Sequence, residues 1–594
     1  METVSNDWKS NQSQRIVNES YVEVSLDISD PDALADATSD DNGAIYISNT
    51  PQVVSEVDKN IPPYATLEQN LWVLNGSRKF LPVSNMGDSG FIGDALSDAN
   101  CGFSGKMPVI TVNFTRVHHN PIPAITITWG DAYGEYAEDF VITAYNGENI
   151  VVKQEVLGNK SVKSVVMMDI VDYDRITIAI HKWCLPNRRA RVADIFVGLN
   201  KVFSKNELFS YSHNQNADPI STSLPKAEVS FSVDNTDRTY DPFNNKGLSK
   251  YLLERQEIKT RYGYKLDDKM EWIPGGTFYL SEWGNSSNDL QAEFKARDLL
   301  EFMSEMVYEG LYNESGTSLY DLATMLFEKA NLPLNNDGSV KWVIDDSLRN
   351  IYTTAPLPID TIANCLQMIA NAGGCVFYQN RKGILHIEPL NTSDSDYSIT
   401  PENSYSKPNI TFSKPLKQVN VSVYHYFDEG TTTELYRGTL QLSGINEVWV
   451  TYSDMAGTAT ATVTGGTLES VEYYTNACKL TIAAEGEVNI VVEGTALKRS
   501  KTDVVTPSGV SGEVITLDNP LITSQERAVA IGTWVAKYLI NRLSASSSWR
   551  ADPRLDALDV VNVRTEYDDY KTVITDVSFD YNGAFKGTSE GKVM

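Results

Sequence analysis

The stretch AEVSFSVDNTDRTYDPFNN, residues 227–245, decides how the middle of this chain folds. Its first half alternates apolar and polar residues, which is the period of a strand with one buried face. Its second half crowds acids and amides together, which raises the question of a metal site. A calcium-binding EF-hand loop needs ligands at alternating positions and a closing Glu. Here Asp234, Asp237 and Asp241 stand three and four apart without that Glu, which favours a turn held by side-chain-to-backbone hydrogen bonds over a calcium site.

Strand patterns continue after this loop. Residues 257–264 and 275–283 alternate in the same way, and within residues 292–303 a strand period changes into a helical one. The pattern predicts a β-barrel with a helix on its edge.

The segment before the loop is also rich in strands. Residues 21–28 form an alternating strand, and residues 30–60, rich in Asp, Ser and Ala, are predicted to be a loop or arm. From residue 61 to about 200, short β-branched runs are separated by Gly, Asn, Asp and Pro, the pattern of a β-sandwich or jelly roll. The clearest runs are residues 109–114, 124–129, 140–145, 175–180 and 192–198.

An α+β segment follows the predicted barrel. Ser318 and Asp321 have the spacing of a capping box and indicate the start of a helix. A second helix ends at Gly373 and Gly374. Two strands that turn at Gly383 come next, so helices and a hairpin share one domain.

The last third returns to strands. Residues 431–507, rich in Thr, Gly, Val and Ala, predict a small inserted β-sandwich. Thr523 and Glu526 form a capping-box spacing before an amphipathic helix, and strands and turns close the sequence. The fold class predicted for the whole chain is multidomain and mostly β, with α+β parts.

Composition limits the function. A chain of 594 residues has room for about four domains. Its net charge of -28 disfavours nucleic acid and anionic lipid as partners. The five cysteines form no CxxC pattern and are expected to be reduced. The polar N-terminal segment and the lack of an 18-residue apolar run predict a protein that is made in the cytoplasm and spans no membrane.

Signatures of catalysis are missing from the sequence. There is no GxSxG, HExxH, P-loop, GxGxxG or DxDxDG motif. The neighbours His118 and His119 would point to opposite faces of an extended chain, which makes shared metal ligation awkward. We therefore predict no catalytic residue, no metal site and no cofactor.

One aromatic stretch, TWGDAYGEYAEDF, is a candidate for binding sugar. Aromatic faces beside polar groups can hold a sugar ring, although packing of the same rings in the core or rim of their own domain is the favoured interpretation. The candidate glycan-binding residues are Trp129, Asp131, Tyr133, Glu135 and Tyr136. The compact basic cluster of Arg188, Arg189 and Arg191 is at most a weak patch for an anion or a partner.

The order of the segments resembles the tail-tip or baseplate hub proteins of tailed bacteriophages, the Tal-like family. AEVSFSVDNTDRTYDPFNN, followed by EIKTRYGY, GGTFYLSEW and FKARDLLEF, is similar to the family's first barrel. IDTIANCLQMIANAGGCVFYQNRKGILHIEPL is similar to its helix-plus-hairpin domain. DNPLITSQERAVAIGTWVAKYL and WRADPRLDALDVVNV resemble its C-terminal part, where the family usually has an acid-Pro-x-Leu-x-x-Gly-Asp turn. This chain has Ala557, Leu558 and Asp559 there, so the usual glycine is missing.

The resemblance covers roughly residues 201–430 and 510–594, and the block from YATLEQNLWVLNGS to ARVADIFVGL looks like a discoidin-like, galactose-binding-type jelly roll inserted into the first barrel. It implies six parts. These are a strand and arm of the first barrel (1–60), the inserted jelly roll (61–200), the rest of the first barrel (201–310), an α+β hub domain (311–400), a second barrel with a helix (401–430 and 508–594) and the inserted small β-sandwich (431–507).

The resemblance also implies a function. Such a protein would be a structural part of the virion, a homotrimer that closes the tail tip, contacts the tail tube, the distal tail ring and the tape-measure protein, and gates DNA passage. Contact with host-surface carbohydrate is a further expectation, and sequence-specific nucleic-acid binding is not expected. The alternatives are a polysaccharide-degrading enzyme with a carbohydrate-binding module, or a simple adhesin. An enzyme of this size would need a catalytic domain of roughly 250 residues, for which the β-modules leave no continuous stretch.

Overall fold

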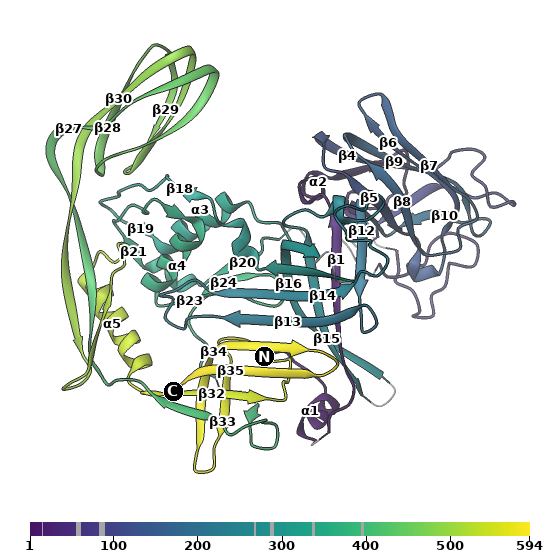
Figure 1. Ribbon diagram of the computed structural model, residues 1–594. Coiled ribbons are helices and arrows are strands. Elements are labelled where there is room, and N and C mark those ends of the chain that lie inside the picture. Colours follow the sequence, from purple (N-terminus) through teal and green to yellow (C-terminus); the bar gives the residue numbers. More distant parts are fainter. Residues whose placement is uncertain are drawn as a thin grey trace.

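The structure is a computed structural model that describes residues 1–14, 16–54, 61–81, 89–266, 269–285, 290–335, 339–393 and 397–594. The fold is multidomain and mostly β, as predicted, and Figure 1 shows its strands gathered into separate sheets around a small helical centre. Among the described residues, none of the helices has both the length and the apolar character needed to cross a membrane.

A 13-stranded sheet forms the body of the molecule. Its main path runs in the order β12 (Gly198–Phe203), β1 (Ser20–Ser29), β15 (Glu257–Leu266), β16 (Lys269–Asn285), β17 (Gln291–Arg297), β14 (Lys226–Asp234), β13 (Leu208–Asn216), β34 (Asp569–Tyr581), β35 (Phe585–Val593), β32 (Leu543–Trp549) and β26 (Asn409–Phe412). Beside this path, β33 (Val560–Arg564) pairs with β34, and β25 (Ser398–Ile399) pairs with β33.

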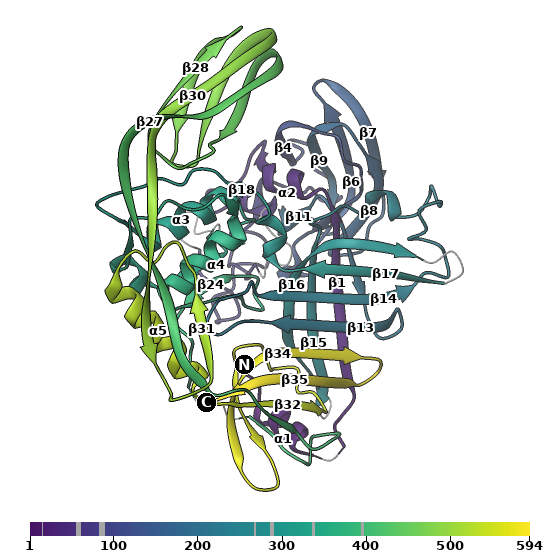
Figure 2. The same ribbon diagram turned by 60° about the vertical axis from the view of Figure 1, so that its left-hand side comes forward.

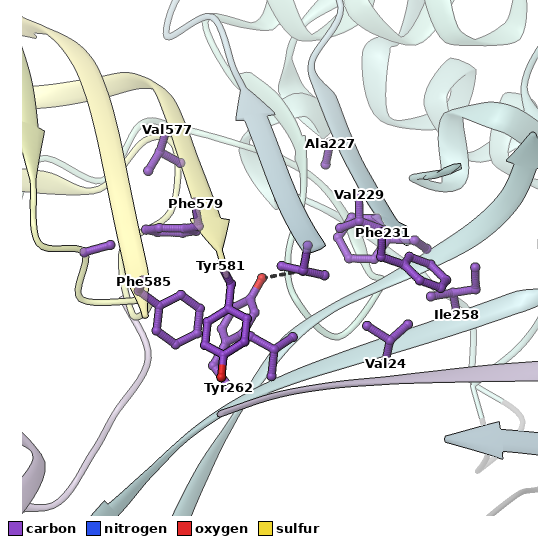
Figure 3. Close-up of a cluster of buried hydrophobic side chains, with 14 of the residues drawn as sticks. Val24, Ala227, Val229, Phe231, Ile258, Tyr262, Val577, Phe579, Tyr581 and Phe585 are labelled. Atoms are coloured by element: carbon purple, nitrogen blue, oxygen red, sulfur yellow. Dashed lines mark hydrogen bonds between the residues drawn. The ribbon is translucent and has the colours of Figure 1, made fainter. Parts of the chain in front are cut away.

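The strands of the two predicted barrels meet where β13 pairs with β34, a junction that we call the seam. There Tyr211 lies opposite Tyr581, and His213 lies opposite Phe579. Residues from both sides of the seam share one core, drawn in Figure 3. The ring of Phe585 meets the edge of Tyr262 at 5.3 Å between ring centroids. The two ends of the sequence therefore complete a single sheet and a single core.

Residues 30–200 form a second β-rich unit over a core of their own, seen at the upper right of Figure 1. A five-stranded sheet has the order β2 (Thr38–Asp41), β4 (Val109–His118), β9 (Tyr173–Trp183), β6 (Ala137–Asn146) and β7 (Asn149–Val156). A three-stranded sheet has the order β11 (Asp194–Phe196), β5 (Ile122–Thr128) and β8 (Lys163–Ile170), and a third pairs β10 (Arg189–Val192) with β3 (Phe91–Leu96). The run predicted at residues 192–198 is thus divided among β10, β11 and the first residue of β12.

The loop or arm predicted for residues 30–60 is wrong where the structure describes it. Asp30 caps the helix α2 (Pro31–Asp36) by accepting a hydrogen bond from the backbone of Asp32, and Pro31 fits the first helical position. The strand β2 then pairs with β4, and η1 (Thr50–Val54) is a 3-10 turn. The segment TSDD has no alternating apolar residues, so its strand is stabilised by its neighbour and is invisible to periodicity.

The α+β domain agrees with the capping signals. Ser318 caps α3 (Leu319–Ala330) and accepts a hydrogen bond from the N–H of Asp321, and α4 (Ile362–Gly373) ends at Gly374 in the left-handed conformation. The hairpin of β23 (Val376–Gln379) and β24 (Leu385–Glu388) follows, with β20 (Trp342–Ile344) parallel to β24. Short elements complete the domain: β18 (Met306–Val307), β19 (Thr317–Ser318), β21 (Tyr352–Thr353), β22 (Asp360–Thr361) and η5 (Asp346–Asn350).

The helix predicted at the end of residues 292–303 is a single 3-10 turn, η4 (Leu299–Phe302). Asp298 caps this turn and accepts hydrogen bonds from the backbone of Leu300 and Ala227. The chain pairs again in β18, at Met306. The turn ends at Met303, so the apolar spacing here serves to bury a short turn and does not build an α-helix.

A long two-stranded ribbon rises from the body, as Figures 1 and 2 show from two directions. It pairs β27 (Leu416–Thr451) with β30 (Ala477–Pro507) over nearly their whole length. At the far end, β28 (Ala456–Thr464) and β29 (Thr467–Tyr473) pair in turn with β30, while β31 (Glu513–Leu517) pairs with β27 at the base.

The far end of the ribbon folds back on itself at a line of three glycines. Gly444 lies in β27, Gly465 in the turn between β28 and β29, and Gly486 in β30. Their φ values of 76°, 93° and 124° are ones that would strain a residue with a side chain. Leu480 and Val488, from the two sides of the crease, bury their side chains in one core. The predicted small sandwich is therefore one sheet bent into two layers.

The cap of the helix α5 (Gln525–Leu539) lies one residue later than predicted. Ser524, not Thr523, accepts the hydrogen bond from the N–H of Arg527. The apolar face of α5 packs on the base of the ribbon and shares a core with α3 and α4. The apolar stripe of this helix is thus buried between the base of the ribbon and the α+β domain.

The turn in which the family glycine is missing places Leu558 at a φ of +72°. Its N–H still donates to the carbonyl of Ile574, which ties the turn to β34. A left-handed conformation costs a residue with a side chain about 1–2 kcal/mol. We expect Leu558→Gly to be more stable than Leu558→Ala by about 1 kcal/mol in urea unfolding. Equal stabilities of the two variants would contradict the strained turn, and Lys407, which lies outside this conformation, should favour Ala in the same comparison.

The seam carries a buried histidine. Burial, with a smaller contribution from the Arg381 guanidinium, lowers the pKa of His213 from 6.5 to about 3. Since the unfolded chain binds this proton and the folded chain does not, the stability is lost as the pH falls from 6.5 toward 3, by up to about 1.4 kcal/mol per pH unit. In urea unfolding between pH 5 and 7, His213→Phe should show a shallower pH dependence than the intact chain. Parallel curves would contradict a neutral, buried His213.

Candidate functional site

In the acidic loop between β14 and η3 (Ser249–Tyr251), the side chains form hydrogen bonds with the backbone of the loop itself. The acceptor and donor pairs are Asp234 with Thr236, Asn235 with Tyr240, Asp237 with Thr239, Asp241 with Phe243 and Asn244 with Lys246, each a side-chain oxygen that accepts from a backbone N–H. The hydroxyl and N–H of Thr239 lower the pKa of Asp237. The loop is therefore a chain of Asx turns, and no cluster of three metal-binding side chains occurs in the parts of the chain that the structure covers.

Trp129, the first of the glycan candidates, is completely buried. Its ring packs edge-on against Phe140, at 4.9 Å, and against Trp183, at 6.2 Å. Its Nε1 donates to the Oγ of Ser164 at 2.8 Å. The candidate role is wrong for this residue, because no face of the indole is open to a ligand.

Glu135 is buried as well, at the centre of an ion-pair network. Its carboxylate accepts from Nε of Arg188 and from Nε1 of Trp183, each at 2.9 Å. Arg191 approaches the same carboxylate at 3.6 Å and is also paired with Glu68. Since these partners saturate it inside the protein, Glu135 cannot hold a sugar either.

The other three candidates lie nearer to solvent. Asp131 is exposed and begins the 3-10 turn η2 (Asp131–Tyr133). The hydroxyl of Tyr133 accepts from the N–H of Tyr64 at 2.7 Å and donates to its carbonyl at 3.2 Å. Tyr136 is half-buried. A role for these three residues in glycan contact stays a prediction.

The arginine cluster does not form an external patch. Arg188 and Arg191 are buried and hold Glu135 and Glu68. Arg189 donates from Nη1 to the carbonyl of Gly93 at 3.3 Å. The expected anion or partner patch is therefore an internal brace between loops.

The neighbouring histidines face opposite ways, as the extended backbone predicted. His118 is buried, with its Nε2 at 2.9 Å from Oδ2 of Asp36. His119 is exposed, with its Nδ1 at 2.7 Å from Oδ1 of Asp172. Each ring thus has its own carboxylate partner.

Two hollows lie near the seam. One, of about 500 Å³, crosses the outer face of β13, β34, β35 and β32 and is lined mainly by short hydroxyl and amide side chains. The other, of about 580 Å³, lies between the seam and the β23–β24 hairpin. At its wall the Nε of Arg381 donates to both carboxylate oxygens of Asp556, at 2.8 and 2.9 Å. Both hollows are open to solvent and have many polar side chains in their lining.

Exposed aromatic residues occur on a loop that the sequence did not single out. Trp72 and Phe80 are exposed, and their ring centroids are 6.1 Å apart. The signal in the sequence was two aromatic residues within a run of Gln, Asn, Gly and Ser, which periodicity does not score.

Comparisons with known proteins found neither a family model nor a curated protein that matches this chain. Solved structures similar to it include the 43 kDa tail protein of prophage MuSo2 from Shewanella oneidensis, with 11% identity over 66% of this chain and 94% of that one and a TM-score of 0.37. A tail protein from Neisseria meningitidis MC58 shares 11% identity over 66% and 93%, with a TM-score of 0.38. A prophage tail protein from Listeria monocytogenes EGD-e shares 9% over 66% and 91%, with a TM-score of 0.36.

Two of the three are prophage tail proteins by name, and the third is named a tail protein. All three TM-scores lie below 0.5.

Proposed function

We propose that the chain is a structural protein of a bacteriophage tail tip, the hub that closes the tail tube. Two lines support this. The order of segments in residues 201–430 and 510–594 resembles the Tal-like hub family. The chain also contributes two β-rich units that lie side by side in one sheet.

The observation that carries the proposal is the seam. A closed ring in which two kinds of unit alternate needs both units on one chain at a fixed angle, and the pairing of β13 with β34 holds the two β-rich units together through backbone hydrogen bonds and a shared core. Three such chains supply six units around one axis. The homotrimer would dock on the tail tube and the distal tail ring and contact the tape-measure protein.

The negative net charge of the chain is consistent with a channel through which DNA passes. The chain has a net charge of -28, and carboxylates along the inner face of a ring repel phosphates, which lets a genome slide without adhering. The role of the hub is then to open for DNA rather than to bind it.

A structural role also suits the charged groups that the chain buries fully or in part. Glu68 and Glu135, which are buried, and Asp556, which is partly buried, hold arginines, and these pairs brace loops and sheets. A glycoside hydrolase instead needs two carboxylates that face a substrate cleft. The three carboxylates named here are committed to structural partners.

The proposal is tested by immunogold electron microscopy on phage particles from the source lysate, with antibody against this chain. Gold confined to tail tips is the expected result, and antibody preabsorbed with the purified chain is the control. Gold found only in the soluble fraction would contradict the proposal. Sedimentation equilibrium of the purified chain should give three times the 66.0 kDa of one chain, and a monomer at all concentrations would contradict the trimer alone.

A further inference from the structure

The loop that carries Trp72, residues 64–80, is closed at its neck by backbone hydrogen bonds. The N–H of Ala65 donates to the carbonyl of Lys79 at 2.9 Å, and the N–H of Lys79 donates to the carbonyl of Pro63 at 2.8 Å. Tyr64 and Lys79 form a parallel bridge. A loop whose ends meet in this way is an Ω-loop, a type that is often functional. We call it the Trp72 loop.

The Trp72 loop is fixed to the β10 strand by buried charge. The side chain of Glu68 is completely buried and pairs with Arg191, and its Oε2 accepts from the N–H of Arg189 at 2.9 Å. The carbonyl of Gln69 accepts from Nη1 of Arg188. An internal ion-pair network thus anchors a surface loop, so little conformational entropy remains to be lost when the loop binds something.

The anchored loop presents aromatic surface to solvent. Trp72 is 45% exposed and Phe80 is 68% exposed, and the two rings lie 6.1 Å apart. Leu67 and Leu74, on the same loop, are exposed as well. Loops that hold large apolar groups in water while the polar groups behind them are buried are characteristic of binding sites.

The exposed polar side chains of the Trp72 loop carry no negative charge, and the exposed Lys79 carries a positive one. Gln69, Asn70, Asn75 and Ser77 lie on the same loop, and Oδ1 of Asn75 fixes the turn by accepting from the N–H and the hydroxyl of Ser77. The acidic residue of this loop, Glu68, is buried and paired with Arg191. Arg78 lies over the ring of Tyr133 at 5.2 Å. Exposed aromatic side chains on a loop rich in amides and hydroxyls suit the C–H face and the hydroxyls of a neutral sugar ring.

We infer that the Trp72 loop is a binding site for neutral saccharides, with Trp72 and Phe80 as the stacking residues. The site specifies the host contact within the proposed tail-tip function and rests on it only for its biological setting. A stable protein partner would bury about 800 Å² on this side, more than the exposed parts of these few side chains supply. The net charge of -28 disfavours anionic lipid.

The test uses the full chain on an array of neutral and acidic oligosaccharides built from glucose, galactose, N-acetylglucosamine and sialic acid, followed by titration of the best neutral ligand. The intact chain should be retained by at least one neutral oligosaccharide. Trp72→Ala and Phe80→Ala should each weaken its Kd at least tenfold. Leu157→Ala changes an equally exposed apolar residue of the same unit and should leave the Kd within twofold. Because the three side chains are exposed, the variants are expected to fold, which circular dichroism checks.

Three outcomes would overturn the inference: retention by no neutral oligosaccharide, equal affinity of Trp72→Ala and the intact chain, or Trp72-dependent flotation with phosphatidylcholine vesicles in place of sugar binding. These outcomes leave the immunogold result untouched. Conversely, saccharide binding by a chain that is absent from tail tips would support the site and remove the hub.

Discussion

Replacing Arg381 by methionine is expected to lower the free energy of unfolding by about 3–5 kcal/mol, because it leaves a partly buried carboxylate at Asp556 without its partner. The guanidinium is buried and makes four hydrogen bonds: two to Asp556, one to the carbonyl of Pro274 at 2.9 Å and one to that of Leu555 at 3.1 Å. It thereby joins the β23–β24 hairpin to both sides of the seam. Urea unfolding followed by circular dichroism measures the loss.

The control for Arg381 is a cation of an ion pair that is exposed to solvent. Lys407 and Glu566 are 2.9 Å apart in solvent, and Lys407→Met should change stability little. The double variant Arg381→Met with Asp556→Asn should recover part of the loss, since the unpaired charge is gone. If the double variant lost the sum of the two single losses, the pair would not be coupled.

Replacing Trp8 by alanine is the second large effect, with an expected loss of about 3–5 kcal/mol. Trp8 is completely buried, meets the ring of Tyr264 edge-on at 4.8 Å and donates from Nε1 to Asp552 at 3.2 Å. It lies on the helix α1 (Asn6–Ser13), which Ser5 caps by accepting from the N–H of Trp8. Trp8 therefore fills the core between β15 and the Asp552 turn.

Trp8→Phe separates packing from the hydrogen bond. It keeps most of the apolar surface and loses only the Nε1 donor, so it should cost clearly less than Trp8→Ala. Hydrogen exchange at β15 reports whether the loss is global or confined to release of α1. Unchanged stability and unchanged exchange in Trp8→Ala would mean that α1 does not pack there in solution.

The sequence was informative where a signal is local. Strands such as β1 and β15 have one face buried, so their alternation was visible, and Ser318 and Gly374 marked helix ends because their caps act within a few residues. The pairing of β13 with β34 could not be predicted, since nothing in either strand specifies a partner that far along the chain.

The candidate site also could not be predicted from local sequence patterns. The stretch around Trp129 looked like a sugar platform because aromatic and acidic residues occur together there, but the same composition describes a buried brace. What separates Trp129 from Trp72 is burial, which depends on the loops that fold over the first and leave the second open. Likewise, the helix period in residues 292–303 was real, but it corresponds to a single 3-10 turn, Leu299–Phe302.

The seam also sets the order in which the protein is completed during synthesis. The strand β13 ends at Asn216, whereas its partner β34 begins at Asp569. With elongation at about 5–20 residues per second, the edge of β13 that pairs with β34 stays unpaired for tens of seconds. An open strand edge can pair with another chain, so crowded ribosomes making this protein run the risk that early edges find each other before β34 arrives.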